Sequence, residues 1–378
     1  MAGSEGRMNA NRGRALTAAD ESEVMAGSTT MDRDRAFYDA ELAPLLPPAV
    51  LDFHAHVWDR RVPAAEPWAE ARPGASYMVT ERSYHPEQLL ADGRAAFPDR
   101  EYRAVCFGDP TPSADNARDT EYVGAAGTRR GLYPLVVAGS PLGVPREILR
   151  ERIERNGFLG FKVHLDWQGD DYGDRTIEGM LGANEMDLAD ELALVVLLHV
   201  PRPGRLADPV VQRGVRWLSG RWPRARIVLA HCGRCYLPAE MERAVGAIRD
   251  LPNVWLDTSM VMEEGVLAVL FGAIDSSRVV YATDFPVAAM RGRRVRVMDH
   301  WVDVVQGDYP DSAYRVKAQG IRVTMMAREI ALAVRDGARR AGLGAEALRG
   351  VFFDNGMKVL AGVRGGEGVR SAEARWRL

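Results

Sequence analysis

Eight short apolar runs, rich in Val, Leu and Ile, recur along the chain from about residue 50 and alternate with amphipathic stretches. This alternation is typical of repeated βα units around a parallel sheet. Apolar character along a whole run fits strands that are buried on both faces, as barrel strands are. The pattern therefore predicts an α/β fold, a (β/α)8 TIM barrel. Its strands are expected within residues 50–57, 102–107, 132–138, 159–165, 194–200, 226–231, 253–258 and 278–284.

The chain of 378 residues is longer than the ~250 residues of a typical barrel, so additions to the barrel are expected. Residues 1–45 are predicted to form a flexible N-terminal extension, because most of them are small or polar and show no periodicity. The metal-dependent barrel domain is expected over 46–362, with an inserted loop after its first strand and extra C-terminal helices over 312–360. Residues 363–378 are predicted to be a polar tail.

Composition limits the partners and the location of the protein. The formal net charge is −3, so the chain lacks the basic field that binding to a nucleic-acid backbone requires. No apolar run approaches the ~20 residues of a bilayer span, and the N-terminus lacks the apolar core of a secretory signal. Three cysteines, Cys106, Cys232 and Cys235, cannot build a disulfide framework. We expect a cytoplasmic protein with no nucleic-acid or membrane partner.

Histidines gather where strands are predicted. Of seven histidines in the chain, His54, His56, His199 and His231 lie in or at the end of apolar runs. Residues i and i+2 of a strand share a face, so His54 and His56 point the same way. Asp284 ends the last run. Because catalytic groups of a barrel lie at the carboxyl ends of its strands, these five side chains are expected to converge.

The converging set has the chemistry of a metal site. Imidazole nitrogen and carboxylate oxygen suit divalent transition metals, with zinc as first choice and iron or manganese as alternatives. Three or four protein ligands leave a position for water. A single histidine on an apolar run is more often a core residue, and Asp284 alone could be a turn residue before Pro286. Five such groups in the order HxH, His, His, Asp favour a metal site.

The segments LDFHAHVWD, VVLLHV, IVLAHCGR and VVYATDFPV resemble the marker strands of the amidohydrolase superfamily. The amidohydrolase-2 branch, with aminocarboxymuconate semialdehyde decarboxylase and the pyrone dicarboxylate lactonases, is similar from about residue 50 to about 360. The resemblance implies that His54, His56, His199 and Asp284 bind a metal. It also implies that His231, together with Asp284, is catalytic and activates the metal-bound water or transfers a proton.

The fourth run departs from a simple site with one metal. It carries Lys162, one of three lysines in the chain, and His164, two residues apart and so on one face. The resemblance to binuclear relatives implies that a carbamylated Lys162 could bridge two ions, and that His164 and His231 could then be ligands. The alternatives for Lys162 are a charge that reaches solvent or an ion pair. His164 could instead contact substrate. One or two ions are therefore expected.

Aromatic and guanidinium side chains follow the predicted strands and indicate the substrate class. An arginine can hold a carboxylate in a bidentate fork, so we expect a small-molecule substrate that carries a carboxylate. Solvated surface arginines are the alternative for each one taken singly. The protein could also assemble as a homodimer. The expected substrate-binding residues are Trp58, Arg60, His164, Arg202 and Arg234.

Three reactions fit such a site. Hydrolysis of an amide, ester or lactone through a metal-activated water is the first choice, and non-oxidative decarboxylation is the second. The third is oxygenation in bacterial secondary metabolism by a non-haem (di)iron centre. A binding protein without activity is disfavoured, because the sequence keeps the complete set of expected ligands.

Overall fold

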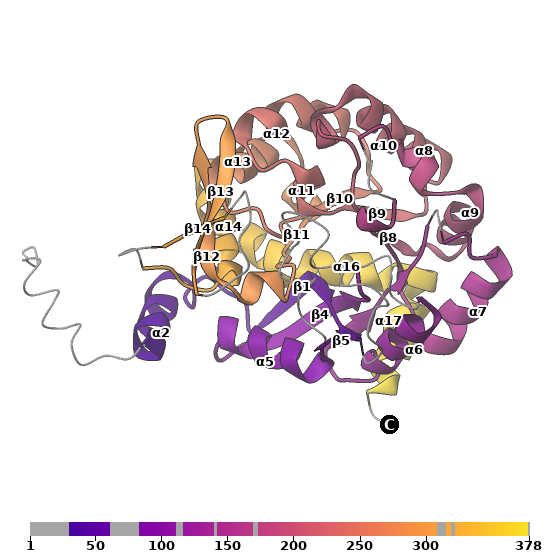
Figure 1. Ribbon diagram of the computed structural model, residues 1–378, viewed down its shortest axis with the longest axis horizontal. Helices are drawn as coiled ribbons and strands as arrows, with labels where there is room; N and C mark the ends of the chain where they lie inside the picture. Colours follow the sequence, from indigo (N-terminus) through magenta and orange to yellow (C-terminus); the bar gives the residue numbers. More distant parts are fainter. Residues whose placement is uncertain are drawn as a thin grey trace, which may run out of the picture.

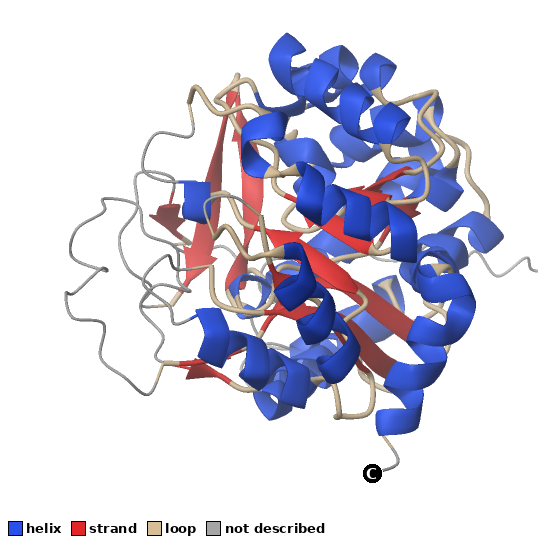
Figure 2. Cartoon of the chain, turned by 90° about the vertical axis from the view of Figure 1, so that its right-hand side faces the viewer, coloured by secondary structure: helices blue, strands red, loops and turns tan. Residues whose placement is uncertain are grey.

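The computed structural model describes residues 30–60, 83–110, 116–139, 142–168, 173–307, 315–318 and 322–376. Most of the predicted N-terminal extension and of the predicted inserted loop, residues 1–29 and 61–82, lie outside this part of the chain. Strands occupy the interior and helices lie around them (Figures 1 and 2).

Each of the eight predicted runs contains a strand, and the strands form two parallel sheets. One sheet has the order β1-β4-β5, and the other has the order β11-β10-β9-β8-β7-β6. The structure therefore confirms a mixed α/β fold with parallel strands. The strands are β1 (Ala49–His56), β4 (Glu101–Phe107), β5 (Leu132–Pro134), β6 (Val136–Val137), β7 (Gly160–Val163), β8 (Val195–Leu198), β9 (Arg226–Leu229), β10 (Val254–Asp257) and β11 (Val279–Val280).

Chain connectivity and backbone hydrogen bonds link the two sheets. Leu135 alone separates β5 from β6 along the chain. At the other ends, Phe53 N of β1 donates to Tyr281 O, and Asp284 N donates to His54 O at 2.8 Å. These bonds fix the segment after β11 beside β1, which brings the last predicted site residue next to the first.

Helices connect the strands and cover them. Local sequence signals set their ends: Asp208 accepts from Val210 N at the start of α10, and Gly157, with φ of 69°, ends α7. None of the described helices has the length and apolar character that a bilayer span needs. The connecting helices are α5 (Pro86–Ala96), α6 (Asn116–Ala126), α7 (Arg146–Asn156), α8 (Ile177–Met180), α9 (Ala183–Leu192), α10 (Pro209–Arg221), α11 (His231–Arg234), α12 (Pro238–Ala244) and α13 (Glu264–Ala273).

Two ends of the chain differ from the sequence prediction. Helix α2 (Thr30–Glu41) lies inside the predicted flexible extension, yet Tyr38 and Leu42 are buried. The predicted polar tail from residue 363 includes a helix, α17 (Glu367–Arg375), which the sequence did not predict. Val369 and Ala372 lie three residues apart on one face of α17 and are buried, which holds this helix on the domain.

A further sheet after β11 was not predicted. It comprises β12 (Arg291–Val297), β13 (His300–Gln306) and β14 (Arg315–Lys317). Its first strand, RGRRVRV, is rich in arginine and has no apolar run, so its residues do not predict a strand. The predicted helix from residue 312 is wrong at β14. The helical part begins later, with α14 (Met326–Arg340), α15 (Ala345–Arg349) and α16 (Asn355–Ala361).

Candidate metal centre

The predicted metal residues lie at the carboxyl ends of the parallel strands. His54 and His56 end β1, His164 and His199 directly follow β7 and β8, and His231 lies two residues after β9. Asp284 follows β11 and is held beside β1 by its backbone. All six side chains are largely removed from solvent. The fold therefore gathers at one end residues that lie up to 230 positions apart in the sequence.

The ligand atoms of this cluster are close together. Those of His54, His199 and His231 lie within 4.8 Å of one another, and so do those of His54, His56 and Asp284. His199 Nε2 is 2.7 Å from His231 Nε2, and His56 Nε2 is 3.2 Å from Asp284 Oδ1. Two neutral ring nitrogens at such a distance repel each other unless a proton or a cation lies between them. Leu165 N donates to His199 Nδ1 at 3.4 Å, so a neutral His199 carries its proton on Nε2 and donates it to His231 Nε2. A bound cation would replace that proton.

Asp257 orients the first histidine of the cluster. Its Oδ2 lies 2.8 Å from His54 Nδ1, so His54 donates from Nδ1 and keeps Nε2 free of the proton. Asp257 Oδ1 accepts from the backbone N–H of His231 and of Ser259. The role of this carboxylate was not predicted from the sequence. A signal was present, because Asp257 stands at the end of the seventh apolar run, where the other site residues also stand.

The outer ring nitrogens of two other histidines are also engaged. His56 Nδ1 faces the carbonyl oxygen of Gly108 at 3.2 Å. His231 Nδ1 faces the Ser259 hydroxyl at 2.8 Å and the Ser259 carbonyl oxygen at 3.1 Å. Carbonyl oxygens only accept, so these contacts place the proton on Nδ1 of each ring. With its proton on Nδ1, the neutral His231 keeps a free lone pair on the Nε2 atom that points into the cluster, whereas His56 Nε2 faces the Asp284 carboxylate.

Lys162 lies inside the cluster. It has 0% exposure, so the alternative of a charge that reaches solvent is wrong. Its Nζ is 3.3 Å from His54 Nε2 and 4.8 Å from the centre of the Phe107 ring. Burial lowers the pKa of Lys162 to about 7, although Asp257 and Asp284 act in the opposite direction. The ammonium group is thus easily deprotonated in this position.

His164 is fully buried, and its ring stacks on His56 with 5.5 Å between the ring centres. Neither ring nitrogen of His164 has a hydrogen-bond partner of regular geometry among the residues that the structure describes, although the Gly108 backbone lies close enough to act on its pKa. A buried polar group without a partner costs free energy, so such groups in folded proteins call for an explanation. A bound ligand that contacts His164 would supply the missing partner.

The ionisation states of the cluster suit metal coordination. Burial and the charge of Lys162 hold the pKa of His54, His164 and His199 well below the usual histidine value. Burial lowers the pKa of His231 to about 3. Burial raises the pKa of Asp284, but the His56 hydrogen bond and nearby positive charge outweigh it, so the pKa is lowered. Neutral imidazoles and an ionised carboxylate are the forms that bind metals.

The backbone around two of these residues is in the left-handed region. Asp284 has φ of 77°, and all residues of 231–234 have φ between 51° and 66°. This conformation costs roughly 1–2 kcal/mol for each residue other than glycine. Backbone strain of this kind concentrates at functional sites, where the surrounding structure holds it.

The predicted substrate-binding residues differ in their surroundings. Trp58 is buried beside His56, with 6.3 Å between the ring centres. Arg60 pairs with Asp109, and Arg202 pairs with Asp208 at 2.8 Å. A carboxylate of the protein thus already holds each of these two arginines.

Arg234 lies near the cluster, because its charge helps to lower the pKa of both His199 and His231. Arg294 and Trp301, which belong to the unpredicted sheet, were not among the predicted site residues. The Arg294 guanidinium lies 3.8 Å from the Trp301 ring centre and 4.6 Å from that of Tyr236, whose ring lies 6.3 Å from that of His231.

Solved structures share this fold at low sequence identity. An amidohydrolase from Burkholderia multivorans with bound zinc has a TM-score of 0.53 and 18% identity, covering 83% of this chain and 99% of its own. The 4-oxalomesaconate hydratase from Rhodopseudomonas palustris has a TM-score of 0.53 and 15% identity over 87% of this chain and 100% of its own. The 5-carboxyvanillate decarboxylase from Novosphingobium aromaticivorans, complexed with manganese and 4-hydroxy-3-methoxy-5-nitrobenzoic acid, has a TM-score of 0.53 and 14% identity over 82% and 96%.

The sequence itself gives the family. No curated protein matches the chain. The family model described as Amidohydrolase, of the Amidohydro_2 type, matches residues 51–297, which is more than half of the chain and includes every residue of the cluster. The chain is therefore an enzyme that belongs to the amidohydrolase family.

Proposed function

We propose that the cluster is a catalytic metal site at the mouth of a (β/α)8 barrel formed by the two sheets together. His54, His56, His199 and Asp284 are the proposed ligands, and zinc is the first choice, before iron or manganese. The observation that carries this proposal is the closeness of the ligand atoms. Those of His54, His199 and His231 lie within 4.8 Å of one another, as do those of His54, His56 and Asp284, so His54 belongs to both groups. The low pKa of His54 supports binding of a cation, because the neutral ring can act as a metal ligand. The His164 ring nitrogens without regular hydrogen-bond partners support binding of a substrate molecule.

Bound at this site, a divalent ion would supply Lewis acidity and lower the pKa of a water molecule to ~7. The protein's own residues would then position the reactants and move protons. His231 is the proposed base, since Ser259 fixes its ring through Nδ1 and its Nε2 points into the cluster. Asp284, whose pKa is lowered, accepts hydrogen bonds and can orient a water molecule.

The proposed substrate is a small organic acid. Arg234 adds positive charge beside the cluster, and Trp58 supplies an aromatic wall next to His56. His164 can donate to or accept from the substrate, because both of its ring nitrogens lack regular hydrogen-bond partners among the described residues. The similar decarboxylase binds a substituted benzoic acid, which supports a carboxylate as the ligand class.

Hydrolysis of an amide, ester or lactone is the first proposed reaction, because the neutral His231 is placed to accept the proton of an attacking water. Decarboxylation is the second candidate. The observation that favours it is the fold similarity to a decarboxylase and a hydratase that act on small carboxylates.

Metal content and product analysis test these proposals together. The full chain is purified without a chelator or a histidine tag, and metals per chain are measured by plasma mass spectrometry. About one zinc per chain together with hydrolysis of a carboxylate-bearing ester or lactone supports the first reaction. Release of carbon dioxide from aromatic acids supports the second. Two irons per chain together with oxygen consumption would favour the oxygenase alternative, with Lys162, His164 and His231 as ligands. Protein without metal, and unable to take it up, would contradict the metal site.

A further inference from the structure

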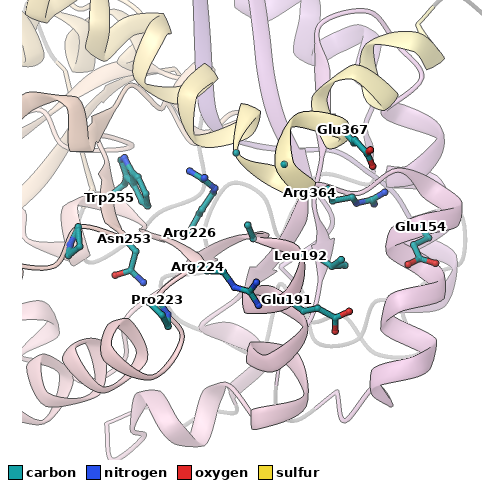
Figure 3. Close-up of a pocket in the computed structure, with 14 residues that line it drawn as sticks. Glu154, Glu191, Leu192, Pro223, Arg224, Arg226, Asn253, Trp255, Arg364 and Glu367 are labelled. Carbon is teal, nitrogen blue, oxygen red and sulfur yellow. The ribbon is translucent and has the colours of Figure 1, made fainter.

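A cavity lies at the opposite ends of the strands from the histidine cluster. Its volume is about 1000 Å³, at the upper end of the range for small-molecule sites. Residues just before β8, β9 and β10 line it, together with the segment between α16 and α17 (Figure 3). Arg226 opens β9 and His231 lies five residues further on, so roughly 16 Å of strand separates this cavity from the cluster. A molecule in this cavity cannot reach the proposed metal.

Arg226 and Trp255 share the wall of this cavity. Trp255 is paired in register with Val228, and Arg226 stands two residues before Val228, so both side chains project from the same face of the sheet. The Arg226 guanidinium lies 5.9 Å from the centre of the Trp255 ring. Figure 3 shows both side chains directed into the same space.

Arg226 carries a charge that the described part of the protein does not neutralise. It forms no ion pair with any residue that the structure describes, and its buried Nε has no hydrogen-bond partner there. Burial lowers the pKa of Arg226, and no carboxylate lies near enough to act against this effect. A partly buried guanidinium without a counter-ion is costly, and an incoming anion would relieve that cost.

The other charged residues of the cavity are already engaged. Arg224 pairs with Asp190 at 3.2 Å, and Glu191 is held by two arginines outside the cavity, Arg146 and Arg150. Arg364 donates to the carbonyl oxygens of residues 153 and 158 and lies near Glu154 and Glu367. Three glutamates line the cavity, but each of them interacts with an arginine other than Arg226. Arg364 Nε is also buried without a partner, but this guanidinium donates through Nη2, whereas no guanidinium nitrogen of Arg226 has a partner among the described residues.

A glycine provides the space for this arginine. A Cβ atom at Gly362 would lie 1.7 Å from Arg226 Nη2 and 1.9 Å from Cζ. The guanidinium therefore lies directly against the Gly362 backbone, with the Trp255 ring as its aromatic neighbour. The backbone of Gly362 has φ of −77°, which alanine adopts freely. Alanine at this position would displace the guanidinium without removing its charge.

We propose that this cavity is a second ligand site, separate from the metal centre, in which Arg226 binds the oxyanion of a small molecule beside Trp255. Carboxylates and phosphates both present a pair of oxygen atoms that a guanidinium can bind through two parallel hydrogen bonds. This assignment does not depend on the reaction at the histidine cluster, since it uses other residues at the other ends of the strands.

Calorimetric titration of the full metal-loaded chain tests the site, with inorganic phosphate and benzoate as separate probes. Binding of either probe is expected at millimolar concentration. Arg226→Gln is expected to weaken it roughly tenfold to a hundredfold, because a charged hydrogen-bond donor is lost. Arg224→Gln is the matched control from the same cavity, whose charge Asp190 already neutralises, and it should leave the affinity within about twofold. Binding of phosphate alone would assign a phosphate ligand, and binding of benzoate alone would assign a carboxylate.

Two further variants keep the proposal open to refutation. Gly362→Ala should weaken binding even if Arg226→Gln is poorly folded, because it moves the guanidinium and keeps the charge. Asp284→Asn should retain binding, because the site is remote from the metal cluster. Binding that is lost in Asp284→Asn but kept in Arg226→Gln would overturn the proposal, and so would the absence of binding of both probes to the wild-type chain.

Discussion

His54 Nδ1 lies 2.8 Å from Asp257 Oδ2, with both side chains fully buried. This carboxylate orients His54 and also accepts from the backbone of His231, so it supports two members of the cluster at once. Carboxylates in this position fix the tautomer and the direction of a metal-binding histidine. Their loss typically lowers metal affinity about 10- to 100-fold.

Asp257→Asn is therefore expected to lower metal affinity by roughly 10- to 100-fold while the protein stays folded. Competition with a metal-binding dye measures the affinity, and circular dichroism checks the fold. Affinity equal to that of the wild type would show that Asp257 does not act through His54.

The two proposed ligands from the first and last strands should behave alike. Asp284→Ala and His54→Ala are each expected to lower metal content and activity together, because each removes a ligand from the shared cluster. Plasma mass spectrometry of the purified variants measures the metal. Asp275→Ala, which removes only a surface cap of a short helix, is the control and should keep wild-type metal content. Full metal content in Asp284→Ala or His54→Ala would contradict its role as a ligand.

His231 can be tested as base against ligand. In His231→Asn we expect the metal to remain and activity to fall by ~100-fold or more, because proton transfer by a positioned side chain contributes about that much. Loss of metal together with activity would instead identify His231 as a ligand, in agreement with its 2.7 Å approach to His199.

Asp52 is expected to stabilise the junction between the two sheets. Its carboxylate accepts from the Tyr102 hydroxyl, the Thr283 backbone and side chain, and the His54 backbone. Asp52→Ala would leave these buried donors without partners, so we expect a loss of about 3 kcal/mol or more in the free energy of unfolding. Tyr102→Phe removes one of the bonds and should cost about 1 kcal/mol. Urea denaturation compares the two variants, and equal midpoints for Asp52→Ala and the wild type would contradict this role.

The cysteines are expected to be unreactive in the folded chain. Burial raises the pKa of Cys106 and of Cys235 to about 12, and all three cysteines are buried free thiols. Since a raised pKa means less thiolate at a given pH, roughly one thiol in ten thousand is ionised at pH 8. Iodoacetamide at pH 8 should modify none of them until urea is added, and mass spectrometry counts the adducts. Rapid labelling of the native protein would show that these thiols are accessible.

The eight strand runs, the shared face of His54 and His56, and the position of each site histidine in or just after a run could be predicted from the sequence alone. These are local properties, because apolar runs and the two-residue repeat of a strand depend only on neighbours along the chain. The arginine-rich β12 lacks such a run and was not predicted. The helix α17 was missed because two buried residues, Val369 and Ala372, are too few to distinguish it from a polar tail.

Which side chains contact one another depends on the packing of the whole domain. The pairing of His54 with Asp257 joins residues 203 positions apart, and the burial of Lys162 depends on strands contributed by the whole domain. The cavity at Arg226 likewise arises where α16 and the segment after it cover the starts of β9 and β10. Distances and burial of this kind depend on how distant segments pack together, and no pattern in neighbouring residues records that packing.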